Sequence, residues 1–308
     1  MLDLALVLTA KPGASAIQHA HVAGIWSRLP ARCRLESEWL GRGEAWQARL
    51  SVDDERAADA VRSIAGDVLA GLPIDINLCA GQGSLRRKRL LVADMESTII
   101  EEECLDELSE FAGLREQVSG ITERAMQGEI EFEAALRERA GLLQGLPTRV
   151  LDEVYERRVT LAPGALTLVR TMKKHGAACA LVSGGFTFFS ERIAERLGFD
   201  VHQANRLEIV DGKLTGRVAE PILAGEAKLA ALEREAAARA IPMSETAAVG
   251  DGANDLAMIR AAGLGVAFRA KPKVVTETRR LANGAVITHG DLTALLYLQG
   301  YRRTEFAG

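Results

Sequence analysis

Residues 90–98 read Leu-Leu-Val-Ala-Asp-Met-Glu-Ser-Thr, an uninterrupted apolar run that ends in two acids. A run without alternation is typical of a strand that is buried on both faces. Two later segments have the same character, at 177–182 and 246–249, and helical patterns occur at 165–175, 186–197 and 226–239. Strands that alternate with helices at this spacing predict an α/β fold, an open parallel sheet with helices on both faces.

Two further features interrupt the alternation of strands and helices. A long helical insertion covers about residues 102–158, directly after the first strand. Residues 207–214 predict an antiparallel hairpin that turns at Asp211-Gly212, because Asp-Gly is a strong two-residue turn signal.

Residues 1–80 are predicted to form a separate, smaller domain. The order strand, helix, strand, strand, helix, strand is that of a ferredoxin-like α+β sandwich. Residues 81–88 contain glycines followed by three basic residues and are typical of a linker. We therefore expect a ferredoxin-like domain at 1–80, a linker at 81–88, and a larger α/β domain at 89–308 that carries the insertion as a helical cap.

Composition excludes several classes of protein. The 308 residues carry a formal net charge of −4, which argues against a chain built to neutralise nucleic-acid phosphates. The four cysteines are scattered without CxxC spacing, which favours buried thiols over disulfides or zinc. No stretch reaches the ~18 apolar residues of a membrane span, and no basic segment typical of a secretory signal is evident. We expect a cytoplasmic protein with no membrane and no nucleic-acid partner.

Three predicted strands of the larger domain end in polar residues, namely Asp94, Ser183 and Asp251. Because the carboxyl ends of parallel strands share one edge of the sheet, we expect these side chains to lie together where open α/β folds bind ligands. Asp94 and Glu96 lie two positions apart on a predicted loop. One carboxylate can attack a substrate or bind a metal ion while the other transfers protons.

The other two clusters and one lysine point to an anion and a metal. Ser183 and the two glycines after it, at a predicted helix start, offer N–H groups and a positive helix end to an anion. Residues 250–255 read Gly-Asp-Gly-Ala-Asn-Asp and offer hard oxygen ligands that suit Mg²⁺. Lys228 is a candidate charge partner of a phosphoryl group. Each cluster alone also fits a plain helix cap or solvated turn.

In this order, residues 94–98, Ser183-Gly184-Gly185, Lys228 and residues 250–255 resemble the four motifs of the haloacid dehalogenase superfamily, and more narrowly those of its bacterial phosphoserine phosphatases. The resemblance covers residues 89–295, including the insertion from residue 101 through Phe132 to Arg139. The unit at 1–80 is similar to the ACT-like domains that sense small molecules.

The resemblance implies an Mg²⁺-dependent enzyme that hydrolyses O-phospho-L-serine to L-serine and phosphate, the last step of serine biosynthesis. Asp94 would attack phosphorus and form an aspartyl-phosphate, which water then hydrolyses. The metal ligands would be the carboxylates of Asp94 and Asp251 and the backbone carbonyl of Glu96.

The remaining motif residues would assist this chemistry. The groups that would bind the phosphoryl oxygens are Ser183, Gly184 and Lys228. Asn254 and Asp255 would orient Lys228 or the metal's water ligands. The one departure is Glu96, because the family pattern has aspartate at this general acid/base position. The longer side chain can serve only if its pKa is raised from the ordinary value.

The insertion would select the substrate. Glu103 would bind the ammonium group of phosphoserine, Arg139 its carboxylate, and Met126 and Phe132 would exclude water. Two alternatives remain open. One is a phosphatase of another small phosphomonoester, and the other is a weakened regulatory protein that binds an amino acid through residues 1–80. An amino-acid effector of this unit and a homodimer are further expectations.

Overall fold

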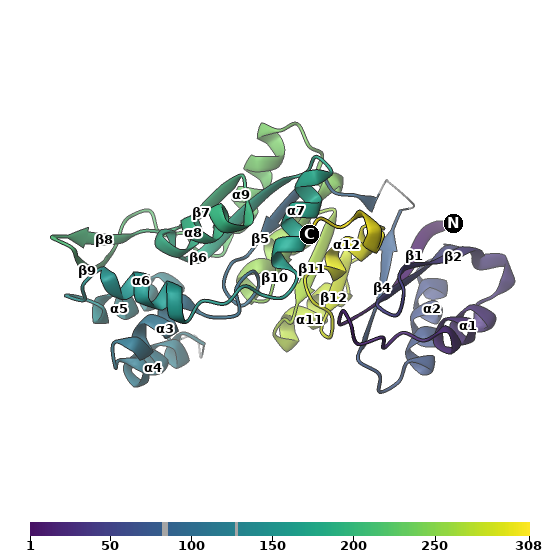
Figure 1. Ribbon diagram of the computed structural model, residues 1–308, viewed down its shortest axis with the longest axis horizontal. Helices are drawn as coiled ribbons and strands as arrows, with labels where there is room; N and C mark the ends of the chain where they lie inside the picture. The colour runs from purple at the N-terminus through teal and green to yellow at the C-terminus, as the bar shows by residue number, and fades with distance from the viewer. Residues whose placement is uncertain (82–85, 127–128) are drawn as a thin grey trace.

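The computed structural model describes residues 1–81, 86–126 and 129–308, without the side chain of Met126. Within them it contains a four-stranded sheet, a six-stranded sheet and a two-stranded hairpin, arranged as three neighbouring regions (Figure 1). The predicted linker residues 82–85 lie outside the described part. No helix of the described chain is long and apolar enough to cross a membrane.

The N-terminal region has the predicted order of strands and helices. Its antiparallel sheet has the order β2-β3-β1-β4, formed by β1 (Leu2–Ala10), β2 (Arg34–Gly41), β3 (Ala45–Val52) and β4 (Ile74–Ala80). Leu6 and Leu8 of β1 pack against α1 (His19–Arg28) and α2 (Glu55–Val68). Asp54 caps α2 by accepting the N–H of Ala57 at 2.9 Å. This small α+β unit is ferredoxin-like, as the sequence predicts.

The six-stranded sheet is parallel and carries the predicted apolar strands at its centre. Its order is β12-β11-β10-β5-β6-β7, with β5 (Leu90–Ala93), β6 (Ala178–Phe186), β7 (Val201–Asn205), β10 (Thr246–Gly250), β11 (Leu264–Phe268) and β12 (Gly284–Ile287). Leu91 packs in a cluster with Leu168 of α7 (Ala165–Lys174), and Leu90 in another with Leu232 of α9 (Glu226–Ala238). Both faces of β5 are therefore buried, which confirms the α/β fold.

Four more helices complete this region, namely α8 (Thr187–Leu197), α10 (Leu256–Ala261), α11 (Pro272–Arg279) and α12 (Ala294–Leu298). The apolar pattern did not predict β11 or β12. The helix expected at 186–197 begins one residue later, at Thr187, because β6 extends through Phe186.

The insertion forms a helical cap that is joined to the hairpin. The cap contains α3 (Cys104–Phe111), α4 (Arg115–Met126), α5 (Phe132–Leu142) and α6 (Arg149–Arg157). The hairpin of β8 (Leu207–Val210) and β9 (Lys213–Val218) turns at Asp211 and Gly212, both with positive φ, as the sequence predicts. Leu214 exchanges backbone hydrogen bonds of 2.8 and 2.9 Å with Gly145 and Leu146 of the cap.

Polar side chains fix the small sheet to the open edge of β12, as Figure 1 lets the reader follow at β4. Asn77 donates to the carbonyl of Val286 at 2.9 Å and accepts its N–H at 2.8 Å, so that one side chain imitates strand pairing. The carboxylate of Asp75 accepts N–H groups from Thr288, His289 and Gly290. These contacts cover the edge of the larger sheet.

Candidate active site

Asp94 and Lys228 form a buried ion pair at the carboxyl edge of the six-stranded sheet. Asp94 directly follows β5, and its Oδ1 lies 2.7 Å from Lys228 Nζ in the first turn of α9. The same ammonium lies 2.6 Å from Oδ1 of Asp255. Burial alone would lower the pKa of Lys228, but the two carboxylates outweigh it and raise the pKa. Lys228 therefore stays protonated and can neutralise an anion beside Asp94.

Three carboxylates at this edge can hold a divalent metal. One oxygen each of Asp94, Asp251 and Asp255 lie within 4.8 Å of one another. Burial raises the pKa of Asp251 to about 6, and the neighbouring Asp255 adds to the rise. Burial also raises the pKa of Asp94, an effect that Lys228 opposes and Asp255 strengthens. A divalent cation would relieve this crowding of negative charge.

The carboxylates of the cluster differ in how many of their oxygens already have hydrogen-bond partners in the protein. Oδ1 of Asp255 contacts Lys228, and its Oδ2 accepts the N–H of Gly252 at 2.9 Å, so both oxygens are engaged. In the described part of the chain, no group donates to the Asp251 carboxylate or to the Glu96 carbonyl. Hard oxygen ligands of this kind fit a cation such as Mg²⁺.

The serine-glycine motif lies in a strand, which corrects one expectation. Ser183, Gly184 and Gly185 belong to β6, and α8 begins only at Thr187. The pairing with β7 is irregular between Val182 and Phe186. The N–H of Gly185 donates to Ser183 Oγ at 2.9 Å. The motif therefore lies at the end of the strand that precedes the helix and not in the first turn of the helix, and its backbone N–H groups and the Ser183 hydroxyl remain to bind an anion.

Glu96 connects this motif to the cap. Its Oε1 accepts the N–H of Cys104, the first residue of α3, at 2.8 Å, and its Oε2 lies 3.5 Å from Ser183 Oγ. Burial raises the pKa of Glu96 to about 7, the charge of Glu103 adds to the rise, and the Cys104 N–H opposes it. A carboxyl group in this range can both donate and accept a proton near neutral pH.

Gly185 provides the space that Glu96 occupies. A Cβ atom at position 185 would lie 2.5 to 2.7 Å from the carboxyl atoms of Glu96, closer than any real contact. Neither this relation nor the hydrogen bond from the Cys104 N–H was predicted from the sequence. The hydrogen bond from Cys104 could have been anticipated, because the first N–H groups of a helix lack partners within the helix and often bind a side-chain oxygen.

The cap brings two more predicted residues, Phe132 and Glu103, to the same site. Phe132, Gly184, Lys228 and Asn254 all line one cavity of about 10 Å³. The exposed Glu103 accepts from Ser97 Oγ at 2.8 Å. The side chain of Met126, at the end of α4, lies outside the described part of the chain.

Arg139 is a half-buried residue of α5. Its guanidinium donates to the carbonyl of Ala135 at 3.3 Å and to Thr122 Oγ1 at 3.5 Å. Burial lowers the pKa of Arg139, and the charges of Glu96 and Glu103 are among those that oppose this effect. A guanidinium with two long hydrogen bonds can still turn toward an incoming carboxylate.

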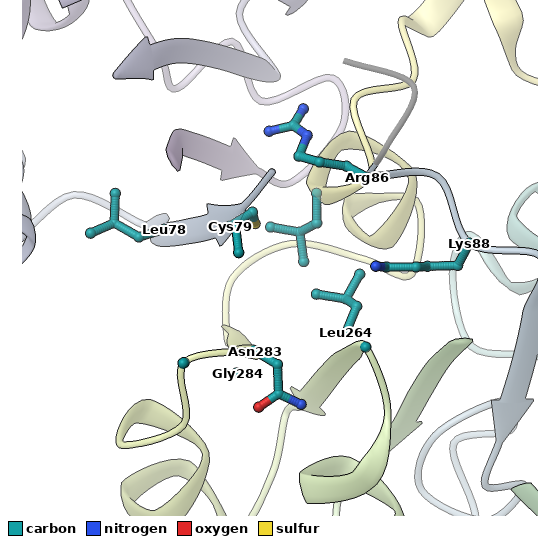
Figure 2. A pocket seen from close by; sticks show the side chains of 11 residues that line it. Leu78, Cys79, Arg86, Lys88, Leu264, Asn283 and Gly284 are labelled. Carbon is teal, nitrogen blue, oxygen red and sulfur yellow. The ribbon is translucent and has the colours of Figure 1, made fainter. Parts of the chain in front are cut away.

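A different cavity lies where the small sheet meets the larger region. Figure 2 shows Leu78 and Cys79 of β4 on one side and Leu264, Asn283 and Gly284 on the other, with Arg86 and Lys88 above. Its volume of about 20 Å³ admits roughly one water molecule. None of the predicted catalytic residues lines it, so the candidate site is the cluster around Asp94.

Comparison with known proteins identifies the family. The family model described as haloacid dehalogenase-like hydrolase matches residues 91–260. The chain belongs to this family. The match runs from β5 to α10 and so includes Asp94, Ser183, Lys228 and Asp251.

Curated and solved relatives of this hydrolase extend beyond the matched segment. The chain is 45% identical over 249 residues to a phosphoserine phosphatase of Streptomyces coelicolor, covering 80% of this chain but only 59% of that relative. A solved structure of a probable phosphoserine phosphatase from Vibrio cholerae is 33% identical, with a TM-score of 0.78 over 98% of this chain and 88% of that one.

A second solved structure, a haloacid dehalogenase family hydrolase from Salmonella enterica serovar Typhi, is 28% identical. Its TM-score is 0.80 over 96% of this chain and 98% of that one. Both structures therefore share the arrangement of the small sheet, the larger sheet and the cap.

Proposed function

We propose that this hydrolase is a phosphoserine phosphatase that converts O-phospho-L-serine and water to L-serine and phosphate, the last step of serine biosynthesis. The observation that carries the proposal is the buried contact of Asp94 with Lys228 beside two further carboxylates. The identity of 45% to a relative named phosphoserine phosphatase supports the choice of substrate.

Asp94 is the nucleophile in this proposal. Its carboxylate attacks phosphorus and expels the serine alkoxide, and water then hydrolyses the aspartyl-phosphate. Ser183, Gly184 and Lys228 bind the phosphoryl oxygens, and we call these three residues the phosphate site. Lys228 offsets the negative charge that would otherwise oppose the approach of Asp94 to a phosphate dianion.

Mg²⁺ fits the carboxylates and the free carbonyl described above. Bound there by Asp94, Asp251 and the Glu96 carbonyl, it would lower the charge repulsion between the nucleophile and the phosphate. Asp255 orients Lys228 through their 2.6 Å contact, and Asn254 lies at the rim of the same cavity.

Glu96 is the general acid and base. As an acid it protonates the serine oxygen when the ester bond breaks, and as a base it then takes a proton from the attacking water. Its pKa of about 7 suits both tasks. The N–H of Cys104 holds the longer glutamate side chain at 2.8 Å, which places the carboxyl group between the cap and Ser183.

The cap recognises the serine part of the substrate. Glu103 binds the ammonium group and Arg139 the carboxylate, because each has the charge opposite to the group it binds and the charges of Glu96 and Glu103 both act on Arg139. Met126 and Phe132 exclude water from the closed site.

A substrate panel tests this function. Purified chain with Mg²⁺ is expected to release phosphate from L-phosphoserine with a kcat/KM at least about tenfold above that for phosphothreonine, a hexose phosphate or an aryl phosphate. Preference for a sugar phosphate, or no release from any ester, would contradict the proposal. Omission of Mg²⁺ with a chelator is expected to abolish release from every ester.

The organisation of the chain is part of the proposal. It assigns an ACT-like domain to 1–80, a linker to 81–88 and a catalytic domain to 89–308 with the cap at about 102–158. We further propose a cytoplasmic location, an amino-acid effector of the first domain and a homodimer. Calorimetry of the full chain with L-serine and sedimentation of the free and serine-bound protein test the effector and the dimer.

A further inference from the structure

Asn205 is the last residue of β7, and its side chain is only 2% exposed. Its Oδ1 accepts the N–H of Leu223 at 2.7 Å, while its Nδ2 donates to the carbonyls of Gly184 at 2.8 Å and Leu223 at 3.3 Å. Only one orientation of the amide satisfies all three contacts, because the carbonyls need the NH₂ group and the N–H needs the oxygen. Asn205 therefore ties two separate segments together.

The first of these segments carries the serine-glycine motif. The carbonyl of Gly184 belongs to the same planar peptide group as the N–H of Gly185, which donates to Ser183 Oγ at 2.9 Å. Holding the carbonyl therefore fixes the plane of this peptide. It also fixes the hydrogen-bond partner of the Ser183 hydroxyl.

The second segment leads into the helix of Lys228. Leu223 lies two residues before Gly225, the N-cap of α9, and five residues before Lys228. Leu223, Gly225 and Lys228 line the same cavity as Ser183 and Gly184. The three hydrogen bonds of Asn205 thus join the two chain segments that supply the phosphate site.

We propose that Asn205 is a positioning residue that sets the separation between the Ser183-Gly184 segment and the Lys228 helix, and thereby the affinity of the phosphate site. The inference rests on the proposed function only in that these residues bind phosphate. Asn205 itself acts through Gly184 and Leu223 and belongs to neither the reacting groups nor the metal ligands.

The substitution Asn205→Asp is nearly isosteric and tests the two donated hydrogen bonds. The aspartate keeps an oxygen for the N–H of Leu223 but places the other oxygen against two carbonyl oxygens. Loss of buried donors of this kind is expected to weaken phosphate binding by about tenfold to a hundredfold. Asn205→Ala removes all three hydrogen bonds without adding charge. If the aspartate variant does not fold, phosphate binding by this alanine variant tests the role of Asn205.

Asn283→Asp is the matched control. Asn283 also donates from one amide to several carbonyls, those of Ile259, Arg260 and Ala262. It precedes β12 and so lies at the amino edge of the sheet, opposite the candidate site (Figure 2 shows it at the other cavity). A similar loss of melting temperature with unchanged phosphate binding is expected.

The measurement is calorimetric titration of the full chain with inorganic phosphate in the presence of Mg²⁺, together with thermal unfolding. The proposal expects a raised Kd for phosphate in Asn205→Asp and Asn205→Ala, and an unchanged Kd in Asn283→Asp. A folded Asn205 variant that binds phosphate within twofold of the parent would overturn it. Phosphate binding needs no turnover, so a chain that fails to hydrolyse phosphoserine would refute the proposed function without deciding the role of Asn205.

Discussion

The carboxyl edge of the six-stranded sheet and the helical cap hold their side chains in opposite ways. At the sheet edge, Asp94, Lys228 and Asp255 are buried and joined by contacts of 2.6 and 2.7 Å. In the cap, Phe132 is 40% exposed, and the two hydrogen bonds of Arg139 are long, at 3.3 and 3.5 Å. One group of residues is fixed before substrate arrives, and the other is free to adjust to it.

This difference matches what the two regions have to do. In the proposed reaction, phosphoryl transfer needs reacting groups held to well within ~1 Å, whereas the substrate would have to pass the cap to enter and leave. Changes of Asp94, Lys228 or Asp255 are therefore expected to affect all phosphate esters equally. Changes in the cap are expected to depend on which ester is offered.

The largest effect is expected from Asp94→Asn. The amide has the shape of the carboxylate but is not a nucleophile, so turnover of every phosphate ester is expected to fall by at least about 10³-fold. Steady-state assays with phosphoserine and an aryl phosphate, beside circular dichroism, measure this. A folded variant that retains a tenth of the parent rate would exclude the covalent mechanism.

A smaller but diagnostic loss is expected from Gly185→Ala. The new methyl group displaces the Glu96 carboxyl group, which lies 2.5 to 2.7 Å from the Cβ position, and a shift of ~1 Å can cost about 10²-fold in rate. Stability is expected to change little, because the displaced atoms end a flexible side chain.

Combining this change with Glu96→Asp is expected to restore most of the activity, because the shorter side chain leaves room for the methyl group. Gly66→Ala, in α2, is the control, since its Cβ would meet nothing within 4 Å. An active Gly185→Ala enzyme, or a double variant no better than the single one, would show that this contact does not position Glu96.

The smallest effect, and the one that depends on substrate, is expected from Arg139→Ala. The kcat/KM for phosphoserine is expected to fall about tenfold to a hundredfold, whereas that for an aryl phosphate without a carboxylate stays within about threefold. The exposed Arg137, which pairs with Glu133 and Glu220, provides the control variant Arg137→Ala. Equal losses on both substrates would place Arg139 in the phosphate site or the fold instead of the cap's recognition of serine.

The sequence predicted the residues at the carboxyl edge of the six-stranded sheet better than it predicted the contacts of the cap and the contacts between distant segments. Apolar runs such as residues 90–93 are buried on both faces, so pattern alone identifies them as central strands. Asp94 and Asp251 directly follow two such strands, and Ser183 lies near the end of a third, so all three fall at the shared edge that the pattern predicts.

Other contacts depend on backbone geometry that no local pattern encodes. The extended backbone at Ser183-Gly184-Gly185 resembles a helix start in sequence, because glycines fit both conformations. Asn205 and Asn77 bond to residues 18 and 209 positions away, so their partners follow only from the tertiary fold.

The most direct test of the account is the pre-steady-state reaction of Glu96→Gln with an aryl phosphate. The good leaving group needs little acid assistance, so Asp94 is expected to become phosphorylated at a near-normal rate, whereas water lacks its base in the second step. A burst of one phenolate per active site is expected, followed by slow turnover, with phosphate retained on Asp94. Full steady-state activity without a burst would contradict it, and would leave Glu96 with no task beyond offering its backbone carbonyl.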